Sequence, residues 1–199
     1  MFQKFVKLCA GRAGQILNLH NLASDVGVSH TTAREWITLL EASYVVFLLQ
    51  PYHANINKRL IKSPKLYFYD IGLVSYLLGI ENKNQIATHP LRGHLFENMI
   101  VIELLKNRYN KGKSNNLNFY RDSNGNEVDI LYAIENKTFP IEIKAGETFT
   151  SDYLKGINSF NKSFPNISND GAVIYTGKFN QTRERIKVWN YLKLKETRP

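Results

Sequence analysis

The chain has 199 residues, of which 43% are hydrophobic, and its formal net charge is +9 at pH 7. This length allows one large or two small domains, and the excess of lysine and arginine favours a polyanionic partner, with nucleic acid preferred over a membrane. A single cysteine excludes an internal disulfide and fits a cytoplasmic protein, and the sequence contains neither an apolar run that could span a bilayer nor a signal peptide.

The N-terminal residues have the spacing of two helices separated by a tight turn. Apolar residues predict a helix over residues 2–13 and a short strand over residues 16–19. A second, short helix is predicted over residues 22–26, with Asn21 as its N-cap and Gly27 at its end.

The next predicted helix covers residues 30–41 and has Ser29 as its N-cap. Helix, glycine-containing turn and helix is the pattern of helix-turn-helix motifs. Polar side chains on the exposed face would contact phosphates or base edges of DNA. These predicted DNA contacts are Thr31, Thr32 and Arg34. An ordinary helical hairpin is the alternative, and the acidic Glu35 and Glu41 favour it.

Two β-rich runs, residues 44–49 and 65–69, flank a basic stretch. Strand, basic loop and strand after such a helix is typical of the wing of a winged helix, in which cations contact phosphates. The cations are Lys58, Arg59 and Lys62. A solvated basic loop is an equal alternative. A helix over residues 71–78, capped by Asp70, would close a winged-helix domain over residues 1–80.

The remaining chain, residues 81–199, is predicted to form a second domain with a central mixed sheet, which makes the protein α+β. Its Asn124-Gly125 pair is the turn chemistry of a β-hairpin. The expected elements are a helix over 91–109, strands over 117–121, 127–134 and 140–145, a helix over 152–164, a strand over 171–176 and a mixed element over 186–192.

Two carboxylates and an amine lie in neighbouring strands of that sheet. Residues two apart in a strand share a face, so Glu142 and Lys144 point the same way. A two-residue turn between the strands would place Asp129 opposite Glu142, and a four-residue loop would place it opposite Lys144. A three-residue loop would separate the groups, since a one-residue slip reverses every side chain.

A third carboxylate, Glu97, lies on the apolar stripe of the helix over residues 91–109. A buried carboxylate needs a cation, so Glu97 either joins the site or forms a salt bridge with Lys144 or Arg92. Carboxylate oxygens suit Mg²⁺ or Mn²⁺, and the histidine and cysteine spacing of a zinc site is absent. We therefore expect a metal held by Asp129, Glu142 and Glu97.

The series Glu97, Asp129, Glu142 and Lys144 resembles the PD-(D/E)XK nuclease superfamily. The resemblance implies an α-β-β-β-α-β core and metal-dependent phosphodiester hydrolysis, with these four residues as the catalytic set. Val128 stands where the superfamily pattern has proline.

Most of the chain is similar to a narrower family, the C-terminal region of prokaryotic AAA-type ATP-binding proteins. That region is a domain of unknown function, in which a winged helix precedes a nuclease-like domain. The resemblance implies an ATPase module as a partner and suggests that Met1 marks a truncation or a split gene. No ATP site is expected, because Phe179 stands where a P-loop has serine or threonine. The matching segments are residues 29–32, 40–44, 62–73, 93–97 and 127–130.

Three functions remain open from the sequence. The first is a metal-dependent DNA nuclease or nuclease-like domain, with the winged helix positioning the DNA. The second is a non-catalytic module that binds nucleic acid or a partner protein for an ATPase. The third is a purely structural or dimerising domain.

Overall fold

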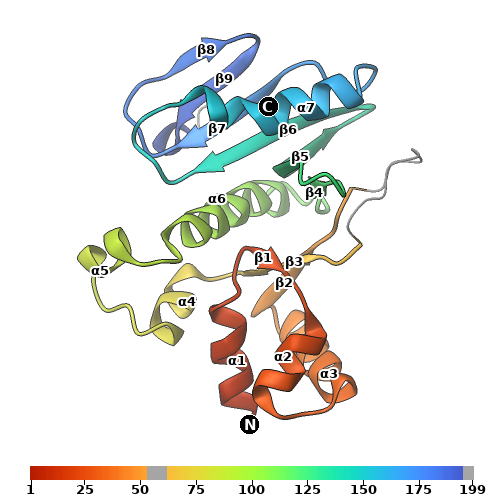
Figure 1. Cartoon of the computed structure of the whole chain (residues 1–199), viewed down its shortest axis with the longest axis vertical. Coiled ribbons are helices and arrows are strands. Elements are labelled where there is room, and N and C mark those ends of the chain that lie inside the picture. Colours follow the sequence, from red (N-terminus) through yellow and green to blue (C-terminus); the bar gives the residue numbers. More distant parts are fainter. Residues whose placement is uncertain (53–61, 195–199) are drawn as a thin grey trace. The chain divides into compact units, whose positions relative to one another are not determined.

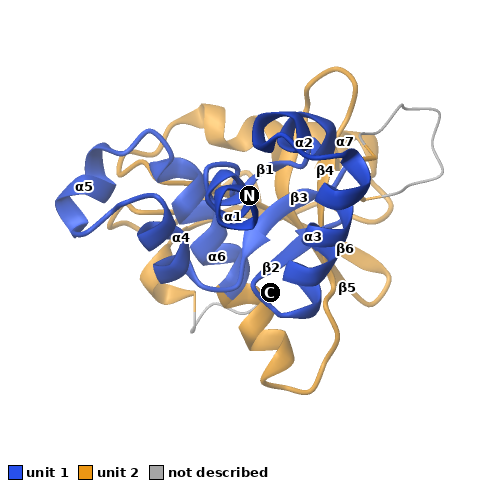
Figure 2. Cartoon of the chain, turned by 90° about the horizontal axis from the view of Figure 1, so that it is seen from below, with its two compact units in different colours: residues 1–50, 63–102 blue, residues 51–62, 103–199 orange. Residues whose placement is uncertain are grey.

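The computed structural model describes residues 1–52 and 62–194 and has an α+β fold (Figure 1). The chain divides into two compact units (Figure 2). Unit 1 comprises residues 1–50 and 63–102, and unit 2 comprises residues 51–62 and 103–199.

The elements of unit 1 form a small antiparallel sheet and a group of helices. β1, β3 and β2 are neighbours in that order, and Val46 of β2 pairs with Phe68 of β3. The predicted elements of this half are present, with shifts of a few residues at their ends, and α5 is an additional helix that was not predicted. The bounds are α1 Phe2–Ala10, β1 Gln15–Ile16, α2 Leu19–Val26, α3 His30–Ala42, β2 Val46–Leu49, β3 Lys65–Phe68, α4 Ile71–Leu77, α5 Lys83–Thr88 and α6 Arg92–Tyr109.

Side-chain caps set the ends of the first helices. The Ser29 hydroxyl accepts a hydrogen bond from the Thr32 N–H at 3.0 Å, as its position before α3 predicts. Gly27 ends α2 with a φ of 86°, a left-handed conformation that glycine adopts without a steric penalty. The prediction for the start of α2 was wrong by three residues. Its N-cap is Asn18, whose side chain accepts from the N–H of Asn21 at 3.0 Å, so Asn21 lies inside the helix.

The core of unit 1 gathers apolar residues from α1, α2, α3 and the sheet. The predicted stripe of α3 faces this core, with Ala33, Ile37 and Leu40 buried. Trp36 stands edge-on to the ring of Phe5 at a centroid distance of 5.2 Å. These contacts orient α3 so that its polar face points to solvent.

The first half of α6 is attached to β3 of unit 1. The side chain of Asn98 is fully buried and forms two hydrogen bonds with the backbone of Phe68, at 2.8 and 2.9 Å. The division between the two units falls inside α6, after residue 102. In the described parts of the chain, no helix is long and apolar enough to cross a membrane.

Unit 2 contains a six-stranded mixed sheet in the order β4-β5-β6-β7-β9-β8. β6, β7 and β9 are parallel neighbours, and the other pairs are antiparallel. The strand β8 and the 3₁₀ turns were not predicted. The bounds are β4 Leu117–Arg121, β5 Glu127–Ile134, β6 Lys137–Lys144, η1 Ser151–Leu154, α7 Lys155–Ser163, β7 Gly171–Tyr175, β8 Gln181–Arg183, β9 Ile186–Asn190 and η2 Tyr191–Lys193.

One face of this sheet is covered by η1 and α7. Leu154 and Ile157 pack with Val173 of β7 and Val188 of β9 in an apolar cluster. A second cluster joins the C-terminal half of α7 to β4 and β5, where Phe160 contacts Tyr120 edge-on at 5.2 Å. We call this the α7 face of the sheet.

Candidate functional site

A two-residue turn, one of the three lengths considered from the sequence, joins β5 to β6. Ile134 pairs with Lys137, and the ladder continues to Ile130 and Ile141, where the pairing stops. Asp129 is the next residue of β5, so it lies just beyond the last ladder pair instead of forming a ladder pair with Glu142.

An irregularity in β5 explains why the ladder ends there. Asn118 of β4 pairs with Leu131, whereas Tyr120 pairs with Val128, so β5 has one extra residue in this interval. Such a β-bulge bends a strand and redirects a side chain, and bulges are frequent next to functional sites. Asp129 lies within the bulge.

The Asp129 carboxylate of β5 contacts β6 at the point where the two strands separate. Its Oδ2 accepts a hydrogen bond from the backbone N–H of Ile143 at 2.8 Å and lies 3.7 Å from Nζ of Lys144. Lys144 Nζ is also 2.5 Å from Oε1 of Glu142. The structure therefore brings together three of the four predicted catalytic side chains.

These three groups lie on the α7 face. Glu142 is in register with Val173, and Lys144 with Tyr175, both of which belong to the apolar cluster under α7. The side chains of Asp129 and Glu142 are 10% and 12% exposed, whereas that of Lys144 is 33% exposed. Two nearly buried carboxylates thus meet one amine that solvent can reach.

The first turn of α7 lies directly against Glu142 and the backbone of Glu127, and Gly156 makes this approach possible. A Cβ at Gly156 would lie 2.2 Å from the carbonyl oxygen of Glu127 and 3.2 Å from Oε2 of Glu142. Only glycine fits this position without moving the helix or the strand. Gly156 was not predicted as a site residue, because a glycine near the start of a helix has no distinguishing pattern in the sequence.

The donor set fits Mg²⁺ or Mn²⁺. Mg²⁺ in proteins is commonly held by one or two carboxylates, with water and substrate phosphate completing its shell. Asp129 and Glu142 supply two carboxylates, and with Lys144 the cluster has a formal charge of −1. Among the described residues, no group of three or more histidine, cysteine, aspartate or glutamate side chains is arranged to hold a metal.

Glu97, the fourth predicted site residue, lies in unit 1 and forms an ion pair there. Its Oε1 is 3.0 Å from Nζ of Lys65 and accepts a hydrogen bond from the Tyr67 hydroxyl, and all three residues are buried in unit 1. The alternation of β3 places Lys65 and Tyr67 on one face, which is the signal that could have identified them.

The predicted DNA contacts of unit 1 lie on the solvent side of α3. Thr31 and Arg34 are exposed, and Thr32 is half-buried, with its hydroxyl 2.9 Å from that of Ser29. Lys62 is exposed. The other two predicted contacts, Lys58 and Arg59, lie outside the described residues.

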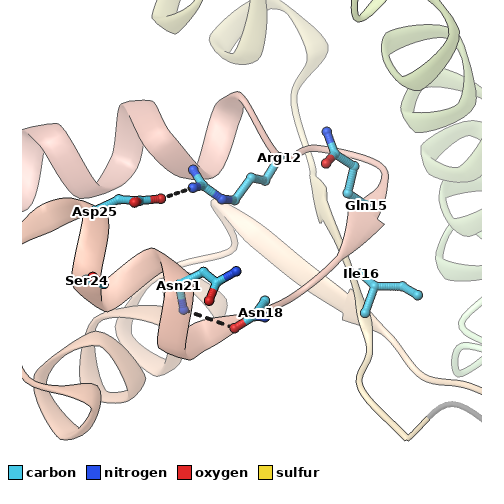
Figure 3. Close-up of a pocket in the computed structure, with 7 residues that line it drawn as sticks. All are labelled: Arg12, Gln15, Ile16, Asn18, Asn21, Ser24 and Asp25. Carbon is cyan, nitrogen blue, oxygen red and sulfur yellow. Dashed lines mark hydrogen bonds and ion pairs between the residues drawn. The ribbon is translucent and has the colours of Figure 1, made fainter.

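A polar hollow of about 310 Å³ lies beside the start of α2 (Figure 3). Arg12 forms an ion pair with Asp25 on one side, and the Asn18 cap lies on the other. These side chains bond to one another, and the hollow contains none of the predicted site residues.

Comparisons with known proteins identify a family. Residues 92–194, more than half of the chain, match the family described as a domain of unknown function, DUF4143. The chain belongs to this family. Residues 1–84 match a second domain of unknown function, DUF8612.

The chain is also similar to uncharacterized proteins of Mycobacterium bovis (Mb2031c) and Mycobacterium tuberculosis (Rv2008c). Each is 32% identical over 135 residues, which cover 68% of this chain and 30% of the relative. The matched region is therefore less than a third of each relative's length. No solved structure matches the chain.

Proposed function

We propose that this DUF4143 protein is a DNA-binding module with a metal-dependent, nuclease-like site of the PD-(D/E)XK type. The observation that carries the proposal is the meeting of Asp129, Glu142 and Lys144 where β5 and β6 separate. The order α6, β4, β5, β6, α7, β7 supports it, because the superfamily resemblance implies an α-β-β-β-α-β core.

In this proposal Asp129 and Glu142 hold Mg²⁺ or Mn²⁺. Such a cation supplies a bound water of lowered pKa and polarises a phosphodiester. The N–H of Ile143 orients Asp129, and the first turn of α7 shields the acidic pair from bulk water. Lys144, which reaches solvent, stabilises the negative charge that develops on the phosphate. Glu97 pairs with Lys65 and thereby attaches α6 to β3.

Unit 1 has the element order of a winged helix, α1-β1-α2-α3-β2-β3, and its strands pair in the order β1-β3-β2. In this proposal α3 is the recognition helix, and its exposed Thr31 and Arg34 contact DNA. The chain's charge of +9 supports a DNA partner.

A non-catalytic module that serves an AAA-type ATPase is the second candidate. The observation that favours it is the ion pair between Lys144 and Glu142, which already neutralises part of the acidic site. The resemblance to C-terminal regions of AAA-type ATP-binding proteins supports an ATPase as the partner.

A cleavage assay on supercoiled plasmid with Mn²⁺ or Mg²⁺ tests the proposal. The full chain should nick the plasmid, and Asp129→Asn or Lys144→Met should lower the rate at least about 100-fold. Asp152→Asn and Lys137→Met are the matched controls, because both residues are exposed in unit 2. Both controls should cut like the wild type.

Binding measured in EDTA separates the two candidates. Cleavage that survives both site substitutions would overturn the assignment of these residues. A wild-type chain that binds plasmid in EDTA yet never cuts it with either metal would establish the non-catalytic module instead.

A further inference from the structure

The hairpin at the end of the described chain forms one edge of the unit 2 sheet. β8 and β9 pair antiparallel, with Arg183 opposite Ile186, and β8 is the terminal strand of the sheet (Figure 1). The two residues between them, Glu184 and Arg185, have φ values of 50° and 70°. Two-residue turns of this kind favour asparagine and glycine, so two charged residues at the tip are unusual.

Positive charge is concentrated on this hairpin. Between residues 178 and 193 there are five cationic side chains and one acidic one, so 16 residues carry +4 of the chain's +9. All five cations are exposed. Glu147, whose carbonyl oxygen lies beside Gly177, is a second acidic residue close to the start of the segment. The cations are Lys178, Arg183, Arg185, Lys187 and Lys193.

Aromatic side chains are interleaved with these cations. Phe179 is 78% exposed. Ile186 and Val188 of β9 point to the α7 face, so Lys187 and Trp189 point to the opposite face. There Lys187 Nζ lies 5.2 Å from the centroid of the Trp189 ring, which is half-buried.

Protection of a sheet edge does not account for this arrangement. One or two lysines on an edge strand suffice to prevent pairing with another chain. A bare phenylalanine beside such an edge works against that purpose, since it adds exposed apolar surface. The combination of cations with accessible rings is instead typical of surfaces that bind single-stranded nucleic acid, where cations follow the backbone and rings stack on bases.

We propose that the β8–β9 hairpin binds a single strand of nucleic acid. Arg183, Arg185 and Lys187 contact its phosphates, and Phe179 stacks on an unpaired base. Only an unpaired base exposes its ring face, so the hairpin prefers a single strand to a duplex. This surface is separate from the acidic site and does not require that site to cut.

Fluorescence anisotropy of the full chain with a labelled oligo-dT of 20 nucleotides, in EDTA, tests the proposal. The double variant Arg185→Glu/Lys187→Glu should bind at least about tenfold more weakly. For this double variant, a plot of the log of the association constant against the log of the salt concentration should have a slope shallower by about 1.4, because two phosphate contacts are lost. Phe179→Ala should weaken single-strand binding at least about fivefold and leave duplex binding within twofold.

The matched control is Lys111→Glu/Lys113→Glu, which changes the net charge equally at exposed positions of unit 2. It should weaken binding less than about threefold. Equal weakening by the two double variants would refute a specific surface, and equal loss of single-strand and duplex binding in Phe179→Ala would refute the stacking role. Displacement of the oligonucleotide by polyglutamate at equal charge would show that any polyanion suffices, which also overturns the proposal.

Circular dichroism of each variant confirms that it is folded, and the exposure of the substituted side chains makes unfolding unexpected. Because cleavage does not occur in EDTA, this result is independent of the nuclease proposal. An inactive acidic site with intact hairpin binding, or the reverse, would identify which of the two proposals fails.

Discussion

The closest approach of α7 to the acidic site gives a sharp prediction for Gly156→Ala. The added Cβ would lie 2.2 Å from the carbonyl oxygen of Glu127, and ordinary contacts begin near 3.4 Å. The helix and the strand must therefore separate by about 1 Å. Because Oε2 of Glu142 is 3.2 Å from the same point, that separation also displaces the carboxylate.

The magnitude follows from two opposing effects. Overpacking costs about 1–3 kcal/mol, and the upper end applies here because the atom that clashes belongs to the backbone. Alanine recovers about 1 kcal/mol through its higher helix propensity. We expect a net loss of about 2 kcal/mol in the free energy of unfolding, which lowers the Tm by about 4–8 °C for a chain of this size.

Thermal unfolding followed by circular dichroism measures the loss, and the plasmid assay measures its effect on the site. A displacement of about 1 Å should lower the cleavage rate about 100-fold. Gly93→Ala is the matched control, because Gly93 is also the second residue of a helix and its added Cβ would meet nothing within 4 Å. It should be neutral or stabilising by about 0.4–1 kcal/mol.

A Gly156→Ala protein as stable as the Gly93→Ala protein would show that α7 does not constrain the acidic site as described. Unchanged cleavage in a measurably destabilised Gly156→Ala protein would show that Glu142 keeps its position when the helix moves.

Three further predictions concern buried polar groups. Lys65→Met removes a buried cation 3.0 Å from the Glu97 carboxylate and should cost about 3–5 kcal/mol in urea unfolding, and adding Glu97→Gln should recover more than half of that loss. Burial raises the pKa of the Asp122 carboxyl, but hydrogen bonds from the Asn126 side chain and backbone outweigh it and hold that pKa below its usual 3.8. The ionised group therefore stabilises the fold above about pH 4, and this stabilisation should be lost as the pH falls below that value. In the Asp122→Asn protein, Tm measured against pH should fall less steeply on the acid side. Burial raises the pKa of the Cys9 thiol to about 12. Iodoacetamide at pH 8 should therefore label Cys9 only after urea is added. Labelling of the folded chain within minutes would contradict this burial.

Local chemistry in the sequence was sufficient for most helix and strand positions. Ser29 was expected to cap α3, and Gly27 to end α2, because each satisfies backbone groups only a few residues away. The length of the β5–β6 turn was not determined in this way, because two-, three- and four-residue connections were all open, and the pairing of Ile134 with Lys137 establishes a two-residue turn. Where the local signal was weak the prediction was wrong or missing. α5 has no apolar stripe and begins with a capping box at Asn82 and Gln85, and the start of α2 was placed at the wrong asparagine.

The sequence by itself thus determined that Glu142 and Lys144 share one face of a strand, because a strand has a period of two. Only the tertiary structure decided which groups join them. The bulge at Asp129 forms where β5 pairs with β4. The close approach of α7 at Gly156 is set by the position of the Glu127 carbonyl oxygen. The ion pair of Glu97 with Lys65 joins a helix and a strand across 32 residues of sequence. Each of these is set by packing between distant segments, which the spacing of residues along the chain does not encode.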